Sequence, residues 1–112
     1  CYTKDSVDYP KIAAETCEKV QGGQAERALL ICGTGIGISI AANKMRGIRC
    51  AVCSEEYSAR LTRKHNDSNV LAMGARTLGS ELSKSILEVW MNTPFDGDEK
   101  TVRRVEQINA LD

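Results

Sequence analysis

The chain has 112 residues, 42% of them hydrophobic, and its fifteen basic residues balance fifteen acidic ones. This length and composition predict one globular domain over residues 1–112, and the neutral charge gives no general attraction to nucleic acid or to a membrane surface. No apolar run approaches the roughly 20 residues of a membrane-spanning helix, and five cysteines without a secretory leader indicate a reducing cytoplasm.

The first half of the chain predicts alternating helices and strands, because its apolar period switches between about 2 and 3.6. Asp8 is expected to cap a first helix, which has Pro10 in its first turn and ends at the Gly22-Gly23 pair. The next elements are a strand over 28–32, a helix over 36–45 that closes near Gly47, and a strand over 48–53.

The second half continues the same alternation. Ser54 is expected to cap a helix over 55–64, and His65-Asn66-Asp67 then reads as a polar turn. The remaining elements are a strand over 69–73 ended by Gly74, a helix with its apolar stripe between Leu78 and Trp90, and a last helix over 99–110.

These elements predict an α/β fold, a three-layer α/β/α Rossmann-like sandwich with a parallel sheet and an additional C-terminal helix. Only three strands are evident, whereas a doubly wound domain normally has five or six. The chain also opens at Cys1-Tyr2-Thr3-Lys4 in loop-like sequence. We therefore expect an N-terminally truncated domain or a sheet that another chain completes.

The most informative segment is a glycine-rich turn, residues 31–39, between the first strand and its helix. It places the thiol of Cys32 beside free backbone amides at a helix N-terminus, an arrangement that lowers a cysteine pKa and stabilises negative charge. Nucleotide loops do not fit, because GxxxxGK[ST] is absent and Ile40 stands where a dinucleotide fingerprint needs a small residue. A phosphatase loop needs arginine where Ile38 stands. The alternative is a purely structural turn around a buried cysteine.

Other candidate residues each have an ordinary structural explanation. The Cys50–Cys53 pair has CxxC spacing, but its odd spacing in a strand sends the two thiols to opposite faces. His65, the only histidine, is either a helix-terminal cap or an acid/base that titrates near neutral pH. Tyr9 would normally pack beside its proline. Four basic residues would ordinarily be surface charges, but their joint spacing also suits a phosphate-binding site. They are Arg76, Lys100, Arg103 and Arg104.

Several separate motifs occur together in this chain. They are Cys32-Gly33-Thr34-Gly35-Ile36-Gly37-Ile38-Ser39, Ala42-Asn43-Lys44, Gly47-Ile48-Arg49, Tyr57-Ser58-Ala59-Arg60, His65-Asn66-Asp67, Asn69-Val70-Leu71-Ala72 and Arg103-Arg104-Val105-Glu106. In their order and separations they resemble the ribose-5-phosphate isomerase B and galactose-6-phosphate isomerase family, over residues 8–108.

The resemblance implies an aldose–ketose isomerase of the pentose phosphate pathway, which interconverts ribose 5-phosphate and ribulose 5-phosphate through an enediolate. It implies that Cys32 is the base, with Thr34 beside it, and that His65 opens the sugar ring. The substrate-binding residues implied are Tyr9, the amides of Gly33, Gly35, Ile36 and Gly37, then Asn66, Arg76, Lys100 and Arg104. His65, Asn66 and the two arginines would reach the thiol from a second subunit of a homodimer or tetramer. The reaction requires no metal and no cofactor.

The sequence departs from the family pattern in two places. The first strand, helix and second strand of the family have no counterpart here, and an inactive sugar-phosphate-binding fragment is therefore the alternative. At Gly97-Asp98-Glu99-Lys100 the family commonly has Gly-Gly-Arg-His, which makes Lys100 the nearest substitute for a family arginine. A galactose-6-phosphate or allose-6-phosphate isomerase subunit is a second alternative, and a redox-active thiol protein is a third.

Overall fold

The computed structural model describes residues 8–112 and contains, within that range, three strands and five helices. The strands are β1 Ala28–Cys32, β2 Cys50–Val52 and β3 Val70–Gly74. The helices are α1 Tyr9–Gln21, α2 Ile36–Asn43, α3 Glu56–Asn66, α4 Ser80–Asn92 and α5 Glu99–Asn109. The loop-like start expected at residues 1–4 lies outside the described residues.

Two local expectations about α3 are wrong. Its N-cap is Glu55 instead of Ser54, because the Glu55 carboxylate accepts a hydrogen bond from the Ser58 amide at 2.9 Å. Its C-terminus extends beyond residue 64, so His65 and Asn66 lie in the last helical turn and not in a polar turn. Asp67 then ends the helix in the left-handed conformation, with φ 47°. The other predicted elements are confirmed to within three residues at each end.

The sheet is entirely parallel, with the strand order β1-β3-β2. Val70 at the start of β3 pairs with both Ala28 and Cys50, so the three strands begin at one edge of the sheet. The opposite edge carries the carboxyl ends, where Cys32 pairs with Gly74. In open α/β sheets this carboxyl edge is where ligands bind.

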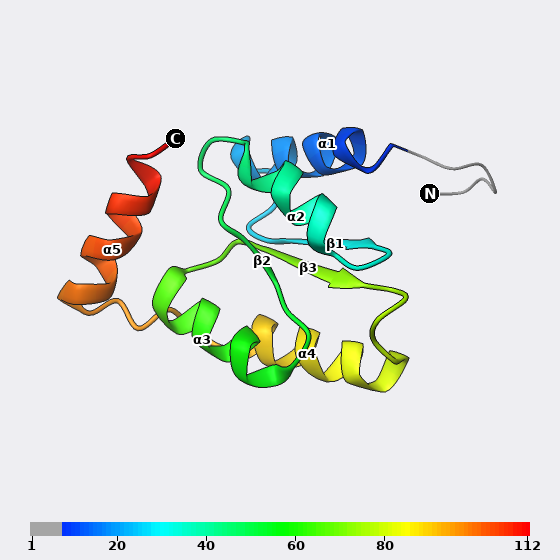
Figure 1. Cartoon of the computed structure of the whole chain (residues 1–112). Coiled ribbons are helices and arrows are strands. Elements are labelled where there is room, and N and C mark those ends of the chain that lie inside the picture. Colours follow the sequence, from blue (N-terminus) through cyan, green and yellow to red (C-terminus); the bar gives the residue numbers. More distant parts are fainter. Residues whose placement is uncertain (1–7) are drawn as a thin grey trace.

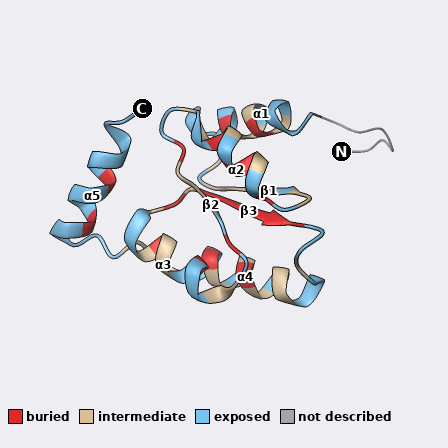
Figure 2. Cartoon of the chain, viewed as in Figure 1, coloured by how far each residue is buried: buried red, intermediate tan, exposed pale blue. Residues whose placement is uncertain are grey.

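Helices cover both faces of the sheet, which confirms the three-layer sandwich (Figure 1). Alternate residues of β3 face opposite layers: Val70 and Ala72 pack with α1 and α2, whereas Leu71 and Met73 pack with α3 and α4. Every residue of β3 is buried, and the buried residues are concentrated along this strand and on the inner faces of the helices (Figure 2).

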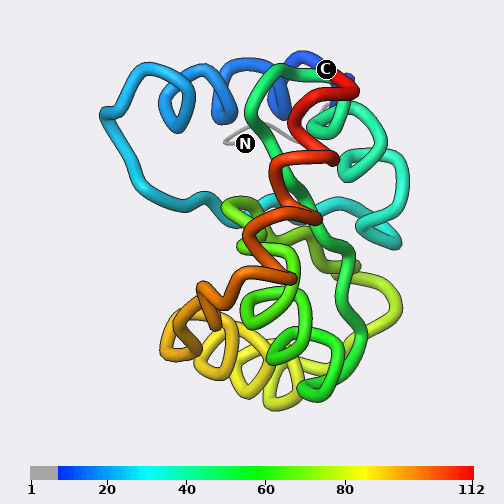
Figure 3. Tube along the Cα trace, turned by 90° about the vertical axis from the view of Figure 1, so that its left-hand side faces the viewer, coloured from blue at the N-terminus to red at the C-terminus, as the bar shows by residue number. Residues whose placement is uncertain are grey.

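Helix α5 packs against α3 and crosses the end of the sandwich (Figure 3). It buries only Thr101 and Val105, and a carboxylate oxygen of Asp112 accepts a hydrogen bond from the Gly47 amide at 2.8 Å. This helix therefore connects the α3 layer to the loop before β2. Among residues 8–112, no helix combines the length and the apolar character needed to cross a membrane.

Candidate active site

The glycine-rich turn of residues 31–39, which we call the thiol turn, connects the carboxyl end of β1 to the start of α2. Gly35, the N-cap of α2, has φ 82°, a left-handed value that side chains strongly disfavour. A Cβ on Gly35 would lie 2.9 Å from the carbonyl carbon of Met73, so the turn rests directly on the backbone of β3. Glycine is required here for both its backbone angle and its lack of a side chain.

Cys32 directs its sulfur at the amides of this turn. The sulfur accepts a hydrogen bond from the Gly35 N–H at 3.2 Å, and the Thr34 hydroxyl oxygen accepts one from the Ile36 N–H at 3.2 Å. Burial raises the pKa of the Cys32 thiol, but the backbone amides of Ile38, Gly35 and Thr34 outweigh it and lower the pKa below its usual value. The arrangement favours a thiolate next to several oriented N–H groups.

Two predicted site residues, Tyr9 and Arg76, lie beside this turn in the same chain. A Cβ on Gly37 would be 2.7 Å from the Tyr9 hydroxyl oxygen, so the phenol of Tyr9 rests on the first turn of α2. The Arg76 side chain lies over Gly33, 3.5 Å from where a Cβ would stand, and its amide donates to the Gly33 carbonyl at 2.9 Å. Arg76 thus reaches the thiol turn from its own chain, and the expectation that it comes from a second subunit is wrong.

The other predicted site residues gather at the end of α3, around a cavity of about 350 Å³. The cavity is lined by His65, Asn66, Asp96, Asp98, Lys100, Thr101 and Arg104. The Nε2 atom of His65 lies 4.0 Å from a carboxylate oxygen of Asp96. The Asp96 amide donates to the Lys64 carbonyl at 3.1 Å, which fastens the loop before α5 to the last turn of α3. We call this group the His65 corner.

The two groups of residues lie at opposite edges of the sheet within one chain. Cys32 is the last residue of β1, whereas His65 and Asn66 precede the first residue of β3, Val70. Five residues of strand separate the two edges, roughly 15 Å at the usual rise per residue. The structure therefore brings Cys32 together with Tyr9, and His65 with Asn66, but it does not bring the two groups together in one chain.

Sequence reasoning gave no role to Asp96. Its sequence signal is weak, because an acidic residue shortly after a proline is ordinary loop composition.

The CxxC prediction is confirmed in its geometry: Cys50 packs toward the α1 and α2 layer and Cys53 toward the α3 and α4 layer. Burial raises the pKa of Cys50 to about 12 and that of Cys53 to about 11, so neither is a thiolate near neutral pH.

A parallel α/β sheet with a low-pKa thiol, a ring of amides and a cation at its carboxyl edge defines a class of protein that stabilises a small anionic intermediate. The family described as "Ribose/Galactose Isomerase" matches residues 1–108. The chain belongs to that family and is an isomerase, which confirms the resemblance seen in the sequence.

Relatives and solved structures agree with this assignment. The chain is 49% identical over 111 residues to ribose-5-phosphate isomerase B of Escherichia coli, covering 99% of this chain and 74% of that protein. It is 44% identical to the Clostridium thermocellum ribose-5-phosphate isomerase B structure, with TM-score 0.96, covering 99% of this chain and 74% of that one. For the type B ribose 5-phosphate isomerase of Trypanosoma brucei the identity is 40% and the TM-score 0.98, covering 100% of this chain and 75% of that one.

Proposed function

We propose that this isomerase interconverts ribose 5-phosphate and ribulose 5-phosphate by proton transfer through an enediolate. The observation that carries the proposal is the Cys32 sulfur held at 3.2 Å by the Gly35 amide, with a lowered pKa, at the N-terminus of α2. The pentose substrate is supported by the names of the E. coli, C. thermocellum and T. brucei relatives, at 40–49% identity. A relative named as a galactose-6-phosphate isomerase subunit, from Clostridium acetobutylicum, is 33% identical.

In the proposed reaction the Cys32 thiolate removes the proton from C2 of the open-chain aldose. The electrons of that C–H bond form the C1–C2 double bond, and the aldehyde oxygen becomes an enediolate oxygen. The amides of residues 33–37 donate to that oxygen, and each such donor is worth about 3 kcal/mol in a transition state. The thiol then returns its proton to C1 while the hydroxyl proton of O2 moves to O1, which yields the ketose. Thr34 stays next to the thiol and helps to orient the sugar.

The remaining predicted residues fit the other requirements of the substrate. His65 opens the hemiacetal ring, and Asn66 and Tyr9 contact sugar hydroxyls. Arg76 binds anionic oxygen beside the thiol turn, and Lys100 and Arg104 hold the phosphate at the far end of the substrate. Binding the remote phosphate fixes the reacting carbons against Cys32. A thiolate base needs a reducing compartment, which supports the cytoplasm as the site of action.

We also propose that the active enzyme is at least a homodimer whose sites combine the thiol turn of one copy with the His65 corner of the other. Two observations support this arrangement. The two groups lie at opposite edges of the sheet, so one chain alone does not surround a small sugar. Exposed apolar side chains also lie next to the thiol turn, at Ile36, Ile40 and Val52, where a second copy would cover them.

The test is an isomerisation assay on three sugar phosphates: ribose 5-phosphate, D-erythrulose 4-phosphate and galactose 6-phosphate. D-erythrulose 4-phosphate belongs in the panel because a Mycolicibacterium smegmatis relative named for that substrate is 41% identical. We expect the highest kcat/KM for ribose 5-phosphate. Preference for another sugar would overturn the pentose assignment. Binding of all three without turnover would instead favour the sugar-phosphate-binding fragment.

A further inference from the structure

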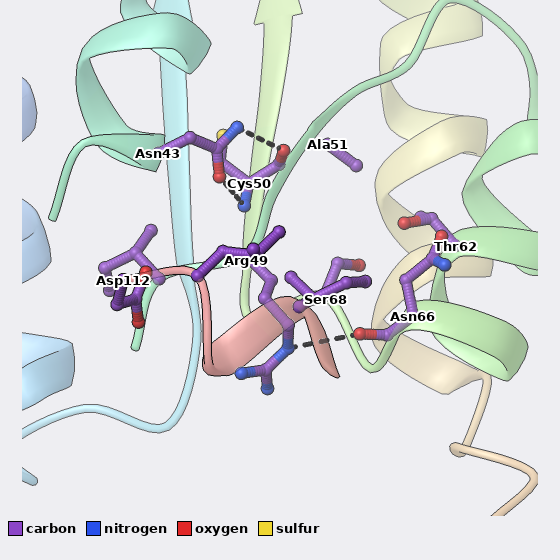
Figure 4. A pocket seen from close by; sticks show the side chains of 11 residues that line it. Asn43, Arg49, Cys50, Ala51, Thr62, Asn66, Ser68 and Asp112 are labelled. Carbon is purple, nitrogen blue, oxygen red and sulfur yellow. Dashed lines mark hydrogen bonds between the residues drawn. The ribbon is translucent and has the colours of Figure 1, made fainter. Parts of the chain in front are cut away.

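The carboxyl end of α3 is held by one side chain from a distant part of the sequence, Arg49. Its Nε donates to the Asn66 carbonyl at 3.1 Å and to the Asp67 carbonyl at 3.0 Å, and Nη2 donates to the Asp67 carbonyl at 2.9 Å. These carbonyls have no partner within the helix, because the last turn of any helix leaves its acceptors free. Arg49 and Asn66 both line a cavity of about 460 Å³, and Figure 4 shows the guanidinium directed at Asn66.

Arg49 is itself fixed by other elements. Its amide donates to the side-chain oxygen of Asn69 at 2.8 Å, and Nη1 donates to the side-chain oxygen of Asn109 in α5 at 3.0 Å. The Arg49 side chain is only 16% exposed. Nε, Nη1 and Nη2 all have partners within the protein, so this guanidinium is not arranged as a phosphate ligand.

The turn that Arg49 holds is also conformationally unusual. Asp67 is the only residue other than glycine with positive φ among residues 8–112. Its carboxylate is bound by the buried Arg63 at 2.9 Å and lies 3.6 Å from Arg49. Non-glycine residues in this conformation persist where surrounding contacts determine them, and such positions concentrate at functional sites. The two residues immediately before Asp67 are His65 and Asn66.

We propose that Arg49 is a positioning residue for the isomerase reaction: by capping the carbonyls of Asn66 and Asp67 with its planar guanidinium, it holds the His65 side chain toward the substrate. This inference rests on the proposed role of His65. The planar guanidinium is essential, because a lysine ammonium at this distance from the backbone does not bond the Asn66 and Asp67 carbonyls in the same geometry. Arg49 does not touch the substrate and acts only through the last turn of α3.

The kinetic test compares Arg49→Met and Arg49→Lys with Arg46→Met, a matched control at an exposed arginine three residues earlier. We expect Arg49→Met to lower kcat on ring-closed ribose 5-phosphate about tenfold, the size expected for a lost charge-assisted hydrogen bond, with little change in KM. An open-chain analogue should lose less than about twofold, because it bypasses His65. Arg49→Lys should not restore the rate, and Arg46→Met should match the unsubstituted enzyme.

A double-substitution cycle separates positioning from general stability. In a His65→Ala background, Arg49→Met should cost almost nothing on the ring-closed substrate, because the group that it positions is already gone. A tenfold loss in both backgrounds, or equal losses on ring-closed and open-chain substrates, would overturn the proposal. Restoration of the rate by Arg49→Lys would also overturn it, since charge alone would then be sufficient.

An NMR measurement tests the positioning role of Arg49 without an activity assay. His65 is the only histidine, so its imidazole C–H signals report on the His65 corner alone in an NMR spectrum. We expect Arg49→Met to shift or broaden these signals while Arg46→Met leaves them unchanged. Unchanged His65 signals would overturn the positioning role. If Arg49→Met does not fold, Arg49→Gln replaces it in each comparison. Absence of isomerisation by the unsubstituted enzyme would count against the proposed function, and the NMR comparison would still test Arg49.

Discussion

The thiol turn and the His65 corner differ in the groups that form them, which are mainly backbone amides in the first and side chains in the second. The thiol turn uses residues adjacent in sequence, and its working groups are mostly backbone amides fixed by a glycine with φ 82°. The His65 corner is held by side chains from far apart, including Arg49 at 3.1 Å from the Asn66 carbonyl and Asp96 at 4.0 Å from His65. Backbone-built sites are encoded locally, whereas side-chain-built sites depend on the whole fold. The two regions should therefore respond differently to substitution.

The largest effect should come from Cys32→Ala, which removes the proposed base and leaves the amides of the turn in place. We expect turnover to fall by about 10³-fold, within the range that general-base catalysis contributes, with sugar-phosphate binding retained. Cys32→Ser is the matched variant, since it keeps the shape but not the acidity. Isomerisation rates and calorimetric binding measure the two quantities. Turnover at the unsubstituted rate would show that Cys32 is not the base.

Substituting Gly35 tests whether the turn depends on its backbone. Gly35→Ala adds a Cβ 2.9 Å from the Met73 carbonyl carbon at positive φ, so we expect it to lower the free energy of unfolding by about 3 kcal/mol and to impair catalysis. Gly23→Ala is the matched control, because Gly23 also has positive φ, at 79°, but no atom lies within 4 Å of its Cβ position. It should cost about 1 kcal/mol. Equal costs in denaturant titrations would show that packing of the turn on β3 contributes little.

His65→Ala tests the His65 corner by removing the imidazole that is proposed to open the sugar ring. We expect the rate on ring-closed ribose 5-phosphate to fall by about 100-fold and the rate on an open-chain analogue by less than about threefold, because only the first reaction needs ring opening. Stopped-flow assays with both substrates provide the comparison. Equal losses on the two would argue against ring opening as the role of His65.

The smallest effects are expected from a change of pH, which distinguishes the thiol of Cys32 from those of Cys50 and Cys53. Alkylation of Cys32 and turnover should both rise with pH through a midpoint below 9.0, because the amides of the turn lower its pKa. Cys53 and Cys50 should react only toward their pKa values of about 11 and about 12. Peptide mass spectrometry after timed iodoacetamide labelling separates the cysteines. A Cys32 midpoint above 9.0 would contradict the described hydrogen bonds.

The lowered pKa of Cys32 has a matching consequence for stability. An acidic group with a lower pKa in the folded state than in the unfolded state stabilises the fold at high pH, where both states are ionised. That contribution is lost as the pH falls through the lowered pKa. The pH dependence of unfolding in Cys32→Ala should therefore lack this component.

The contrast between the thiol turn and the His65 corner explains which features the sequence could predict. The strand over 28–32, the turn after it and the low-pKa thiol follow from the order of a few adjacent residues. The structure confirms the strand bounds and places the Gly35 amide, one of the groups that lower the pKa, 3.2 Å from the Cys32 sulfur. The end of α3 was predicted two residues too early, because Arg49 and the Asp67 conformation extend the helix past residue 64. Arg76 was assigned to the wrong subunit, since nothing local shows that its backbone bonds to Gly33.

In the arrangement that we propose, a working site joins the thiol turn of one copy to the His65 corner of another. Mixing Cys32→Ala and His65→Ala chains, each nearly inactive alone, tests it directly after subunit exchange. Half of the dimers would contain both variants, and half of their sites would be intact, so about a quarter of the unsubstituted activity should return. Recovery at that level is the predicted result. No recovery, with mixed dimers verified by mass spectrometry, would contradict the account.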